Sequence, residues 1–246
     1  MPDGFDASTA FSMAEKVVIV TGGGTGIGKV YSQRLAQSGA KVVLADIAAK
    51  ESDELAASIR ESGGQALSVP TDVTDPEAVQ KMADATAAEF GGIDGLINNA
   101  SMMSVLERGD WFKIDPDRWD AVMAVNLKGI FLCCRAVYPY MQKRGGGRIV
   151  NISSGRIWEG NPNRLDYTTS KAGVIGLTRA LAREVGEFGI TANCIAPGLT
   201  MSEHLVDQEQ WTSIKGANTA SRALKREEVP EDLLGAVVFF SSADSD

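Results

Sequence analysis

Short apolar runs alternate with segments of helical period along most of this chain, and that alternation limits the possible folds more than any other feature. The runs are rich in β-branched residues and apolar on both faces, a pattern typical of strands in a parallel sheet that helices cover on each side. The predicted strands are residues 17–21, 41–46, 66–70, 95–98, 148–153 and 191–196. The predicted helices are residues 29–38, 50–62, 76–90, 118–143, 166–188 and 230–240.

Strands and helices that alternate in this way, joined by right-handed crossovers, form a doubly wound parallel α/β sheet of the Rossmann type with helices on both faces. Ligands of such sheets bind beyond the carboxyl ends of the strands. The 246 residues show no break in composition and no linker rich in proline or serine. We therefore expect a single domain over residues 14–246, preceded by a flexible leader over residues 1–13.

Composition excludes several classes of function. The formal net charge of −8 argues against nucleic acids and anionic membranes as partners, because both require a basic face. His204 is the sole histidine, so a multi-histidine metal site is impossible and we expect no metal. Cys133, Cys134 and Cys194 lack zinc-ligand spacing and fit buried thiols in a reducing cytoplasm. No apolar run approaches the roughly 18 residues that cross a bilayer, and the first residues do not resemble a signal peptide.

The first predicted strand runs directly into the glycine-rich segment TGGGTGIG, residues 21–28, and a helix follows. Glycines let a backbone approach a pyrophosphate closely, and a helix start presents free N–H groups and the positive end of its dipole to an anion. An ordinary tight turn is the alternative, but a position between a strand and a helix favours a dinucleotide site.

Asp46 ends the second predicted strand, where a carboxylate accepts hydrogen bonds from both hydroxyls of the adenosine ribose and repels a 2′-phosphate. Thr25 and Ile47 stand where a cation would bind that phosphate, so we expect NAD rather than NADP. The alternative for Asp46 is a solvated aspartate at a strand end.

Asp72 and Val73 follow the third predicted strand. Asp72 is a candidate partner for the adenine amino group, and Val73 is a candidate packing surface for the ring. The alternative for Asp72 is a helix N-cap, a role for which Asp75 is better placed.

Tyr167 and Lys171 lie four residues apart at the start of a long predicted helix, so their side chains share one face. A nearby cation lowers the pKa of a phenol from about 10, and the positive nicotinamide ring would lower it further. Tyr167 is then able to accept a proton from an alcohol or donate one to a carbonyl oxygen, while Lys171 holds the nicotinamide ribose. The alternative is a chance pair on the surface.

Two further polar residues fit the same chemistry. Ser154 follows Ser153 at the end of the fifth predicted strand, where a hydroxyl can bond the substrate oxygen as charge develops on it. Asn126 lies in the middle of a predicted helix, where asparagine is unfavourable. We expect Asn126 to perturb the helix and hold a water that relays protons to Lys171; the alternative is a local distortion without function.

In order and spacing these residues resemble the short-chain dehydrogenase/reductase family over roughly residues 16–244. The resemblance also includes Asn98-Asn99-Ala100 after the fourth strand and Pro197-Gly198 after the sixth. It implies a dinucleotide-binding catalytic domain that transfers a hydride without a metal, and a homotetramer packed through the two long helices. The implied catalytic tetrad is Asn126, Ser154, Tyr167 and Lys171. The cofactor contacts that the resemblance implies are Gly22, Thr25, Gly26, Ile27, Gly28, Asp46, Ile47, Asp72, Val73, Asn99, Ala100, Tyr167, Lys171, Pro197, Gly198, Leu199 and Thr200.

Two features depart from the family pattern. Ser101 stands where the family has a glycine after Asn-Asn-Ala. The chain also ends at Asp246, before the final strand that family members carry. We expect a trimmed sequence rather than an open sheet edge.

The substrate pocket is expected along residues 101–111, 155–164 and 199–222, and residues 199–223 would suit a mobile lid. Apolar side chains in these segments favour an apolar or aromatic secondary alcohol or its ketone: Met102, Met103, Trp158, Met201, Leu205 and Trp211. Arg156 and Arg164 either pair with a carboxylate or are solvated surface charges, and both readings stay open.

The sequence therefore predicts a cytoplasmic, NAD-dependent alcohol dehydrogenase or ketone reductase. An epimerase or an enoyl reductase on the same fold is an alternative, although the enoyl branch usually has a wider separation between its tyrosine and lysine. A redox sensor that binds NAD without turnover would have little need for Ser154, Tyr167 and Lys171 together. The intact cofactor turn argues against a purely structural domain.

Overall fold

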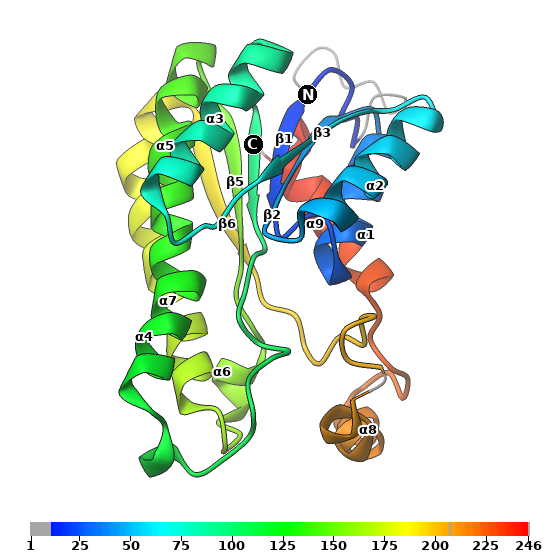
Figure 1. Ribbon diagram of the computed structural model, residues 1–246, viewed down its shortest axis with the longest axis vertical. Helices are drawn as coiled ribbons and strands as arrows, with labels where there is room; N and C mark the ends of the chain where they lie inside the picture. The colour runs from blue at the N-terminus through cyan, green and yellow to red at the C-terminus, as the bar shows by residue number, and fades with distance from the viewer. Residues whose placement is uncertain (1–10, 207, 246) are drawn as a thin grey trace, which may run out of the picture.

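A single six-stranded parallel sheet forms the centre of the protein, with helices on both faces (Figure 1). The computed structural model describes residues 11–206 and 208–245. The strand order is β3-β2-β1-β4-β5-β6. The strands are β1 (Val17–Thr21), β2 (Lys41–Asp46), β3 (Gln65–Pro70), β4 (Gly95–Asn98), β5 (Gly147–Ile152) and β6 (Ile190–Ile195). The doubly wound parallel fold predicted from the sequence is confirmed.

The central strand β1 is buried along its whole length and pairs in parallel with β2 on one side and β4 on the other. Val20 lies opposite Leu44 in β2 and opposite Ile97 in β4. The chain passes from β1 to β2 and β3, and then returns to β4 on the other side of β1. Connections that diverge in this way leave a crevice at the carboxyl ends of β1 and β4.

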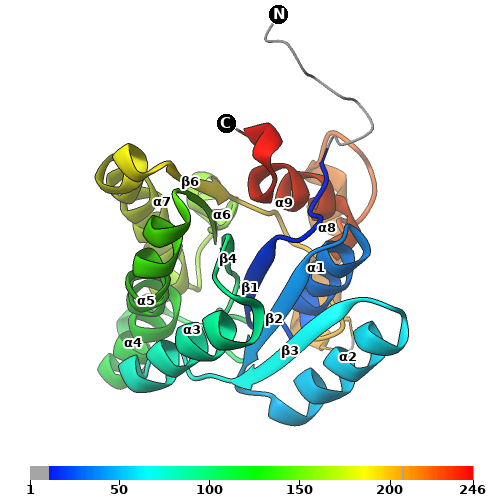
Figure 2. The ribbon, with the colours of Figure 1, turned by 90° about the horizontal axis from the view of Figure 1, so that it is seen from above.

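The helices form two layers, and alternate strand residues face each layer (Figure 2). Ile19, Leu96 and Ile149 face α3, α5 and α7, while the neighbouring strand residues Val18 and Val150 face α1 and α9. The α-helices are α1 (Gly26–Gln37), α2 (Ala49–Glu61), α3 (Pro76–Phe90), α4 (Pro116–Met123), α5 (Gly129–Arg144), α6 (Arg156–Glu159), α7 (Leu165–Val185), α8 (Glu209–Ser221) and α9 (Leu234–Ser241). Short turns of other helical types are η2 (Trp111–Lys113), η3 (Ala124–Lys128), η4 (Gly186–Phe188), η5 (Pro230–Leu233) and η6 (Ala243–Ser245).

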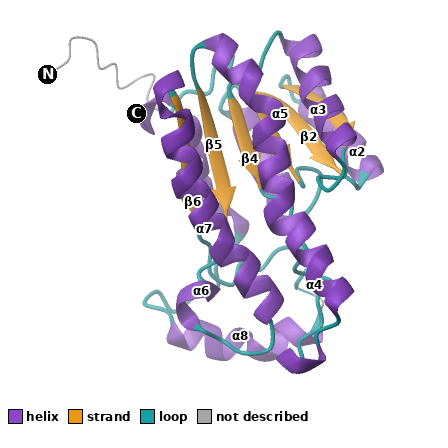
Figure 3. Cartoon of the chain, turned by 90° about the vertical axis from the view of Figure 1, so that its left-hand side faces the viewer, coloured by secondary structure: helices purple, strands orange, loops and turns teal. Residues whose placement is uncertain are grey.

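The sequence did not predict α6 and α8, which lie with α4 beyond the strand arrowheads (Figure 3). α6 is a single turn, and α8 contains Gly216 together with serine, threonine and asparagine, which are weak helix formers. α1 also begins at Gly26 rather than at residue 29, because the last glycines of the turn already form its first helical turn.

The helix predicted over residues 118–143 spans Pro116–Arg144 without interruption, through α4, the π-helical turn η3 and α5. By length and composition alone this helix is apolar enough to cross a membrane, which corrects the expectation that no such run exists. Half of its most apolar stretch is buried, and Leu132, Val137 and Met141 belong to the core beside the sheet. Packing in that core accounts for its apolar character.

The leader predicted over residues 1–13 falls mostly on residues 1–10, which lie outside the described part of the chain. Met13 is fully buried, and its N–H donates to the carbonyl oxygen of Ser38 at 3.1 Å. At Met13 the chain is therefore already part of the core.

Candidate active site

The glycine-rich turn after β1 has a backbone geometry that larger side chains would block. Gly22 has a φ of 61°, and a Cβ on Gly28 would lie 1.9 Å from the carbonyl oxygen of Gly22. Asn99, just after β4, donates from Nδ2 to the carbonyl oxygens of Thr21 and Gly22, both at 3.1 Å. The turn is therefore fixed between β1, α1 and the end of β4, with backbone rather than side chains at its surface.

A carboxylate from a distant segment binds the start of α1. The Gly26 N–H donates to Glu203 Oε1 at 2.8 Å, and Lys29 Nζ lies 3.4 Å from Oε2. The hydrogen bond from Gly26, with smaller effects of Lys29 and His204, lowers the pKa of Glu203. An anion thus occupies the end of α1 that favours negative charge. No local pattern in the sequence predicts this contact of Glu203, because its position depends on how the segment after β6 folds back.

Asp46 is buried and joins the end of β2 to the glycine turn. Its Oδ2 accepts from the Gly24 N–H at 2.9 Å, and its Oδ1 accepts from the Ala48 N–H at 3.1 Å. The alternative of a solvated strand-end aspartate is therefore wrong. The neighbouring Ile47 is 77% exposed and also lines the cavity described below.

Asp72 and Val73 lie at the same edge of the sheet, after β3. Asp72 Oδ1 accepts from the N–H and hydroxyl of Thr74, at 2.8 and 2.7 Å. Asp75, not Asp72, caps α3 by accepting from the Glu77 N–H at 2.9 Å, so the helix-cap alternative for Asp72 is wrong. Val73 is buried and lines the cavity.

Asn126 lies in the π-helical turn η3, so the expected perturbation of the helix is present. Its Oδ1 accepts from the Met102 N–H at 2.7 Å, and its Nδ2 donates to Ser170 Oγ at 3.1 Å. The fully buried amide therefore joins the loop after β4 to α7. Its relay of protons to Lys171 stays a prediction.

Tyr167 and Lys171 lie on the buried face of α7 beside the end of β5. Lys171 Nζ lies 5.9 Å from the centre of the Tyr167 ring and donates to the carbonyl oxygen of Ile152 at 2.8 Å. Ser154 shares a hydrogen bond with the Tyr167 side chain. Ser153 is used differently, since its hydroxyl donates to the carbonyl oxygen of Lys171 at 2.7 Å. The tyrosine, the lysine and Ser154 thus form one cluster.

The electrostatics of this pair differ from the expectation that Lys171 makes Tyr167 acidic. Burial raises the pKa of Tyr167, and burial lowers the pKa of Lys171 to about 8. The groups that lower the pKa of Tyr167 are Ser154, Arg164 and Arg156. Both charged forms lose solvation in the same buried place, and the lowering of the Tyr167 pKa beside a bound nicotinamide stays a prediction.

A cavity of about 750 Å³ at the carboxyl ends of the strands contains most of the predicted site. Of the predicted cofactor and catalytic residues, the cavity is lined by Gly22, Thr25, Gly26, Ile27, Asp46, Ile47, Asp72, Val73, Asn99, Ala100, Ser154, Tyr167, Lys171, Pro197, Gly198, Leu199 and Thr200. Gly28 and Asn126 lie behind this surface and support it.

The substrate side of the cavity is lined by Met102, Met103, Leu205, Trp211 and the two arginines Arg156 and Arg164. Two predicted apolar contacts are absent from its lining. Trp158 is 70% exposed, and Met201 packs beneath the surface with Leu205 and Trp211. Ile214 and Asn218 also line the cavity, inside the predicted segment 199–222 but on the unpredicted helix α8. Lining residues that the sequence did not predict include Glu51, Thr71 and Val125.

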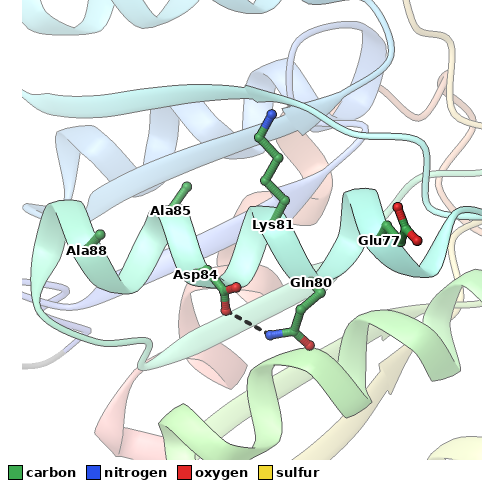
Figure 4. Close-up of a pocket in the computed structure, with 6 residues that line it drawn as sticks. All are labelled: Glu77, Gln80, Lys81, Asp84, Ala85 and Ala88. Carbon is green, nitrogen blue, oxygen red and sulfur yellow. Dashed lines mark hydrogen bonds between the residues drawn. The ribbon is translucent and has the colours of Figure 1, made fainter.

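A second hollow of about 510 Å³ follows the exposed side of α3 (Figure 4). Asp84 accepts hydrogen bonds there from Gln80 at 2.8 Å and from Tyr140, and these bonds lower its pKa. The hollow lies on the flank of a single helix, away from the strand ends. Among the described residues, no cluster of His, Cys, Asp or Glu side chains could hold a metal ion.

Comparison with known proteins gives one consistent family. A family model described as short chain dehydrogenase matches residues 16–213. The (2S)-[(R)-hydroxy(phenyl)methyl]succinyl-CoA dehydrogenase subunit BbsD of Thauera aromatica is 37% identical, over 94% of this chain and 90% of that protein. The cis-4-hydroxycyclohexanecarboxylate dehydrogenase of Sinomonas cyclohexanicum is 34% identical, over 94% and 91%. The crystal structure of a Brucella melitensis 3-ketoacyl-(acyl-carrier-protein) reductase with NADH has a TM-score of 0.87 at 27% identity, over 95% and 93%.

The chain belongs to the short-chain dehydrogenase/reductase family. It is an oxidoreductase of that family, which acts on substrates of the alcohol or ketone type and binds a nicotinamide cofactor. Solved relatives carry NADH in one case and NADP in another.

Proposed function

We propose that this protein is an NAD-dependent alcohol dehydrogenase or ketone reductase in which Tyr167 transfers the proton. One observation carries the proposal: Tyr167, Lys171 and Ser154 line the same cavity as the glycine turn and Asp46. A group that can exchange a proton therefore lies in the crevice where a dinucleotide is expected.

The residues present fit a nicotinamide dinucleotide. The backbone of the turn at Gly22 reaches the cavity without a side chain, and the start of α1 already binds a carboxylate. The turn and α1 would hold the pyrophosphate, Asp46 the adenosine ribose, and Lys171 the nicotinamide ribose. When bound, the nicotinamide supplies or accepts the hydride.

In the direction of ketone reduction, Tyr167 acts as an acid. Because burial raises its pKa, the phenol is protonated at neutral pH and can donate its proton to a carbonyl oxygen during ketone reduction. Ser154, hydrogen-bonded to the same phenol, is placed to bond that oxygen as well. Alcohol oxidation requires the phenolate, so we expect oxidation to become faster as the pH rises.

Two features support the finer assignment. The buried carboxylate of Asp46 disfavours a 2′-phosphate, which supports NAD over NADP. Apolar side chains on the substrate side, among them Met103, Leu205 and Trp211, support an apolar or aromatic secondary alcohol. The names of the two curated relatives specify substrates in which the hydroxyl-bearing carbon is attached to a phenyl ring or belongs to a cyclohexane ring.

A panel of apolar secondary alcohols at about pH 9, with NAD and with NADP, tests this function. We expect absorbance from NADH with at least one alcohol, and a higher kcat/KM with NAD than with NADP. Binding of NAD without turnover of any alcohol or ketone would instead favour a redox sensor. Equal or better use of NADP would contradict the cofactor assignment.

Two predictions concern the assembly and the location of the enzyme. We expect a homotetramer packed through α5 and α7, which would bury the exposed ring of Phe131. Light scattering measures the mass of the assembly and so tests this expectation. A soluble cytoplasmic enzyme also stays a prediction.

A further inference from the structure

Tyr167 lies on the first turn of α7, in the part of the helix that extends past the sheet (Figure 3). Val174, two turns later, packs in the core beside the sheet. The ring of Tyr167 packs instead with Leu106 of the loop after β4 and with Val122 of α4. The place of the phenol therefore depends on how α4 and that loop meet the start of α7.

Arg164, immediately before α7, ties this end of the helix to the loop. Arg164 is 2% exposed, and its side chain donates to the carbonyl oxygens of Met103 and Leu106, at 3.1 and 2.7 Å. The alternative of a solvated surface charge is therefore wrong for Arg164. These bonds hold Leu106 where it packs with the ring of Tyr167.

Side chains bind the backbone of Tyr167 at both its N–H and its carbonyl oxygen. The N–H belongs to the first turn, where N–H groups have no partner within the helix, and it donates to Asp166 Oδ1 at 2.8 Å. The carbonyl oxygen accepts from Ser170 Oγ at 2.7 Å, and that oxygen accepts in turn from Asn126 Nδ2 at 3.1 Å. The negative charge of Asp166 also suits the positive end of the helix dipole.

Asp166 is itself held by Arg118 of α4. The carboxylate is fully buried, the Arg118 side chain is 27% exposed, and Nε lies 2.8 Å from Oδ2. A buried carboxylate that loses its cation is strongly destabilising. The ion pair therefore holds α4 against the first turn of α7.

Arg118 belongs to a row of side chains that all bear on the tyrosine. Arg118, Val122 and Asn126 are four residues apart, so they follow one face of the continuous helix Pro116–Arg144. The first acts on the N–H of Tyr167 through a carboxylate, the second packs with its ring, and the third acts on its carbonyl oxygen through a serine. One face of this helix thus fixes the tyrosine at three points.

We propose that Arg118 and Asp166 are positioning residues, which hold the phenol of Tyr167 in place for proton transfer by fixing the first turn of α7 against α4. The inference rests on the proposed function and deepens it. Neither side chain of the pair lines the cavity, so the pair acts through Tyr167 rather than on the substrate. The hydrogen bond between Ser154 and the phenol depends on the same placement.

Breaking the pair should slow the chemical step and leave binding unchanged. A displacement of about 1 Å in a reacting group can cost about 100-fold in rate. In Arg118→Met we therefore expect kcat for alcohol oxidation to fall by about 10- to 100-fold, while KM for the alcohol and Kd for NADH stay within about threefold. Arg118→Lys keeps the charge but not the planar group, and should hold kcat within about fivefold of the wild type. Arg34→Gln, which removes one exposed positive charge on α1, is the matched control and should change none of these values.

Asp166→Ala breaks the pair from the other side. Arg118 is partly exposed, so its charge can turn toward water and the variant leaves no buried ion without a partner. Both Arg118→Met and Asp166→Ala should raise the pH at which oxidation reaches half its maximum, because the bond from Ser154 that lowers the pKa of Tyr167 weakens in both. Charged groups that face the phenol stay the same in both variants: Arg156, Arg164 and Lys171.

A direct effect of charge would give a different result. One variant removes a cation and the other an anion, so charge alone would shift the pH of half-maximal oxidation in opposite directions. Opposite shifts would overturn the inference.

Amide hydrogen exchange, measured by NMR on the protein without substrate, follows the same geometry without turnover. In Arg118→Met the Tyr167 amide should exchange at least about tenfold faster than in the wild type, while the amide of the buried Val174 changes by less than about threefold. Similar acceleration at both amides would indicate a general loss of stability and overturn the inference. Unchanged kcat in Arg118→Met and Asp166→Ala would also overturn it and leave the proposed function intact. Failure of the wild type with every alcohol, with NAD bound, would instead overturn the proposed function.

Discussion

The two sides of the cavity are built in different ways. On the cofactor side, the turn at Gly22, Asp46 and Asn99 follow β1, β2 and β4 directly, and hydrogen bonds between neighbouring strand ends hold them together. On the substrate side, long-range contacts bring separate segments together, as in the stacking of Arg164 on Trp211. The first side is fixed by the register of the sheet, whereas the second depends on loops and short helices that the sheet does not position.

The largest contrast is expected from one substitution made on each side. In Gly28→Ala the new Cβ would lie 1.9 Å from the carbonyl oxygen of Gly22. We therefore expect the free energy of unfolding to fall by about 2–3 kcal/mol, and NADH binding to become too weak to measure. In Gly216→Ala, within α8, the Cβ meets no atom within 4 Å, and stability should rise by about 0.5–1 kcal/mol. Urea denaturation and NADH titration measure both, and equal effects would contradict the contrast.

Lys171 lies where the two sides meet, and its burial predicts a dependence of stability on pH. Its pKa is about 8 in the folded protein, against about 10.4 in an unfolded chain. Between these values only the unfolded chain holds the proton, so stability should rise by up to about 3 kcal/mol from about pH 8 to about pH 10.4. Below about pH 8 the penalty is fully present.

Lys171→Met should lack this rise while keeping a similar side-chain volume. Urea denaturation of both proteins at about pH 7.5 and about pH 10 measures the difference, with the pH dependence of the variant subtracted. A difference between the two proteins that does not change with pH would show that Lys171 keeps its charge throughout.

The cofactor side should allow a designed change of specificity. Asp46→Ala combined with Ile47→Arg removes the carboxylate and adds a cation, which should shift the ratio of kcat/KM for NADP over NAD by about tenfold or more toward NADP. Ile47→Arg alone is the control, and with Asp46 in place the ratio should change much less. An unchanged ratio in the double variant would mean that Asp46 does not face the ribose.

The smallest effect is expected from the carboxylate that bridges the two sides. Glu203→Gln keeps a side chain able to accept from the Gly26 N–H but removes the charge at the start of α1. If the carboxylate competes with the pyrophosphate, NADH should bind about threefold more tightly. Glu89→Gln, at an exposed position of α3, is the control for net charge. Weaker binding in Glu203→Gln would mean that Glu203 helps to hold the cofactor.

The sequence predicted the cofactor side well, because each motif there follows a strand whose position the apolar pattern defines. Glycine spacing, the strand-end Asp46 and the spacing of Tyr167 and Lys171 are local features, and the structure brings these residues to one cavity. Glu203 was missed for the opposite reason, since it reaches α1 from 177 residues away in the chain.

The substrate side shows what local patterns leave open. Arg164 carries no mark in the sequence that distinguishes a buried cation from a solvated one, and its burial depends on Trp211 and on the loop after β4. Burial also raises the pKa of Tyr167, and charge spacing along a helix says nothing about this loss of solvation. Both points concern burial, which a single helix does not determine.

The central claim is that the phenol of Tyr167 exchanges the proton. The most direct test is to measure the rate of hydride transfer in the Tyr167→Phe variant. The variant keeps the ring in its buried position and removes only the hydroxyl. Rapid mixing of enzyme and NAD with an alcohol substrate should show NADH formation slowed by about 100- to 10,000-fold, with NAD affinity within about threefold of the wild type. NADH formation at the wild-type rate would contradict the account.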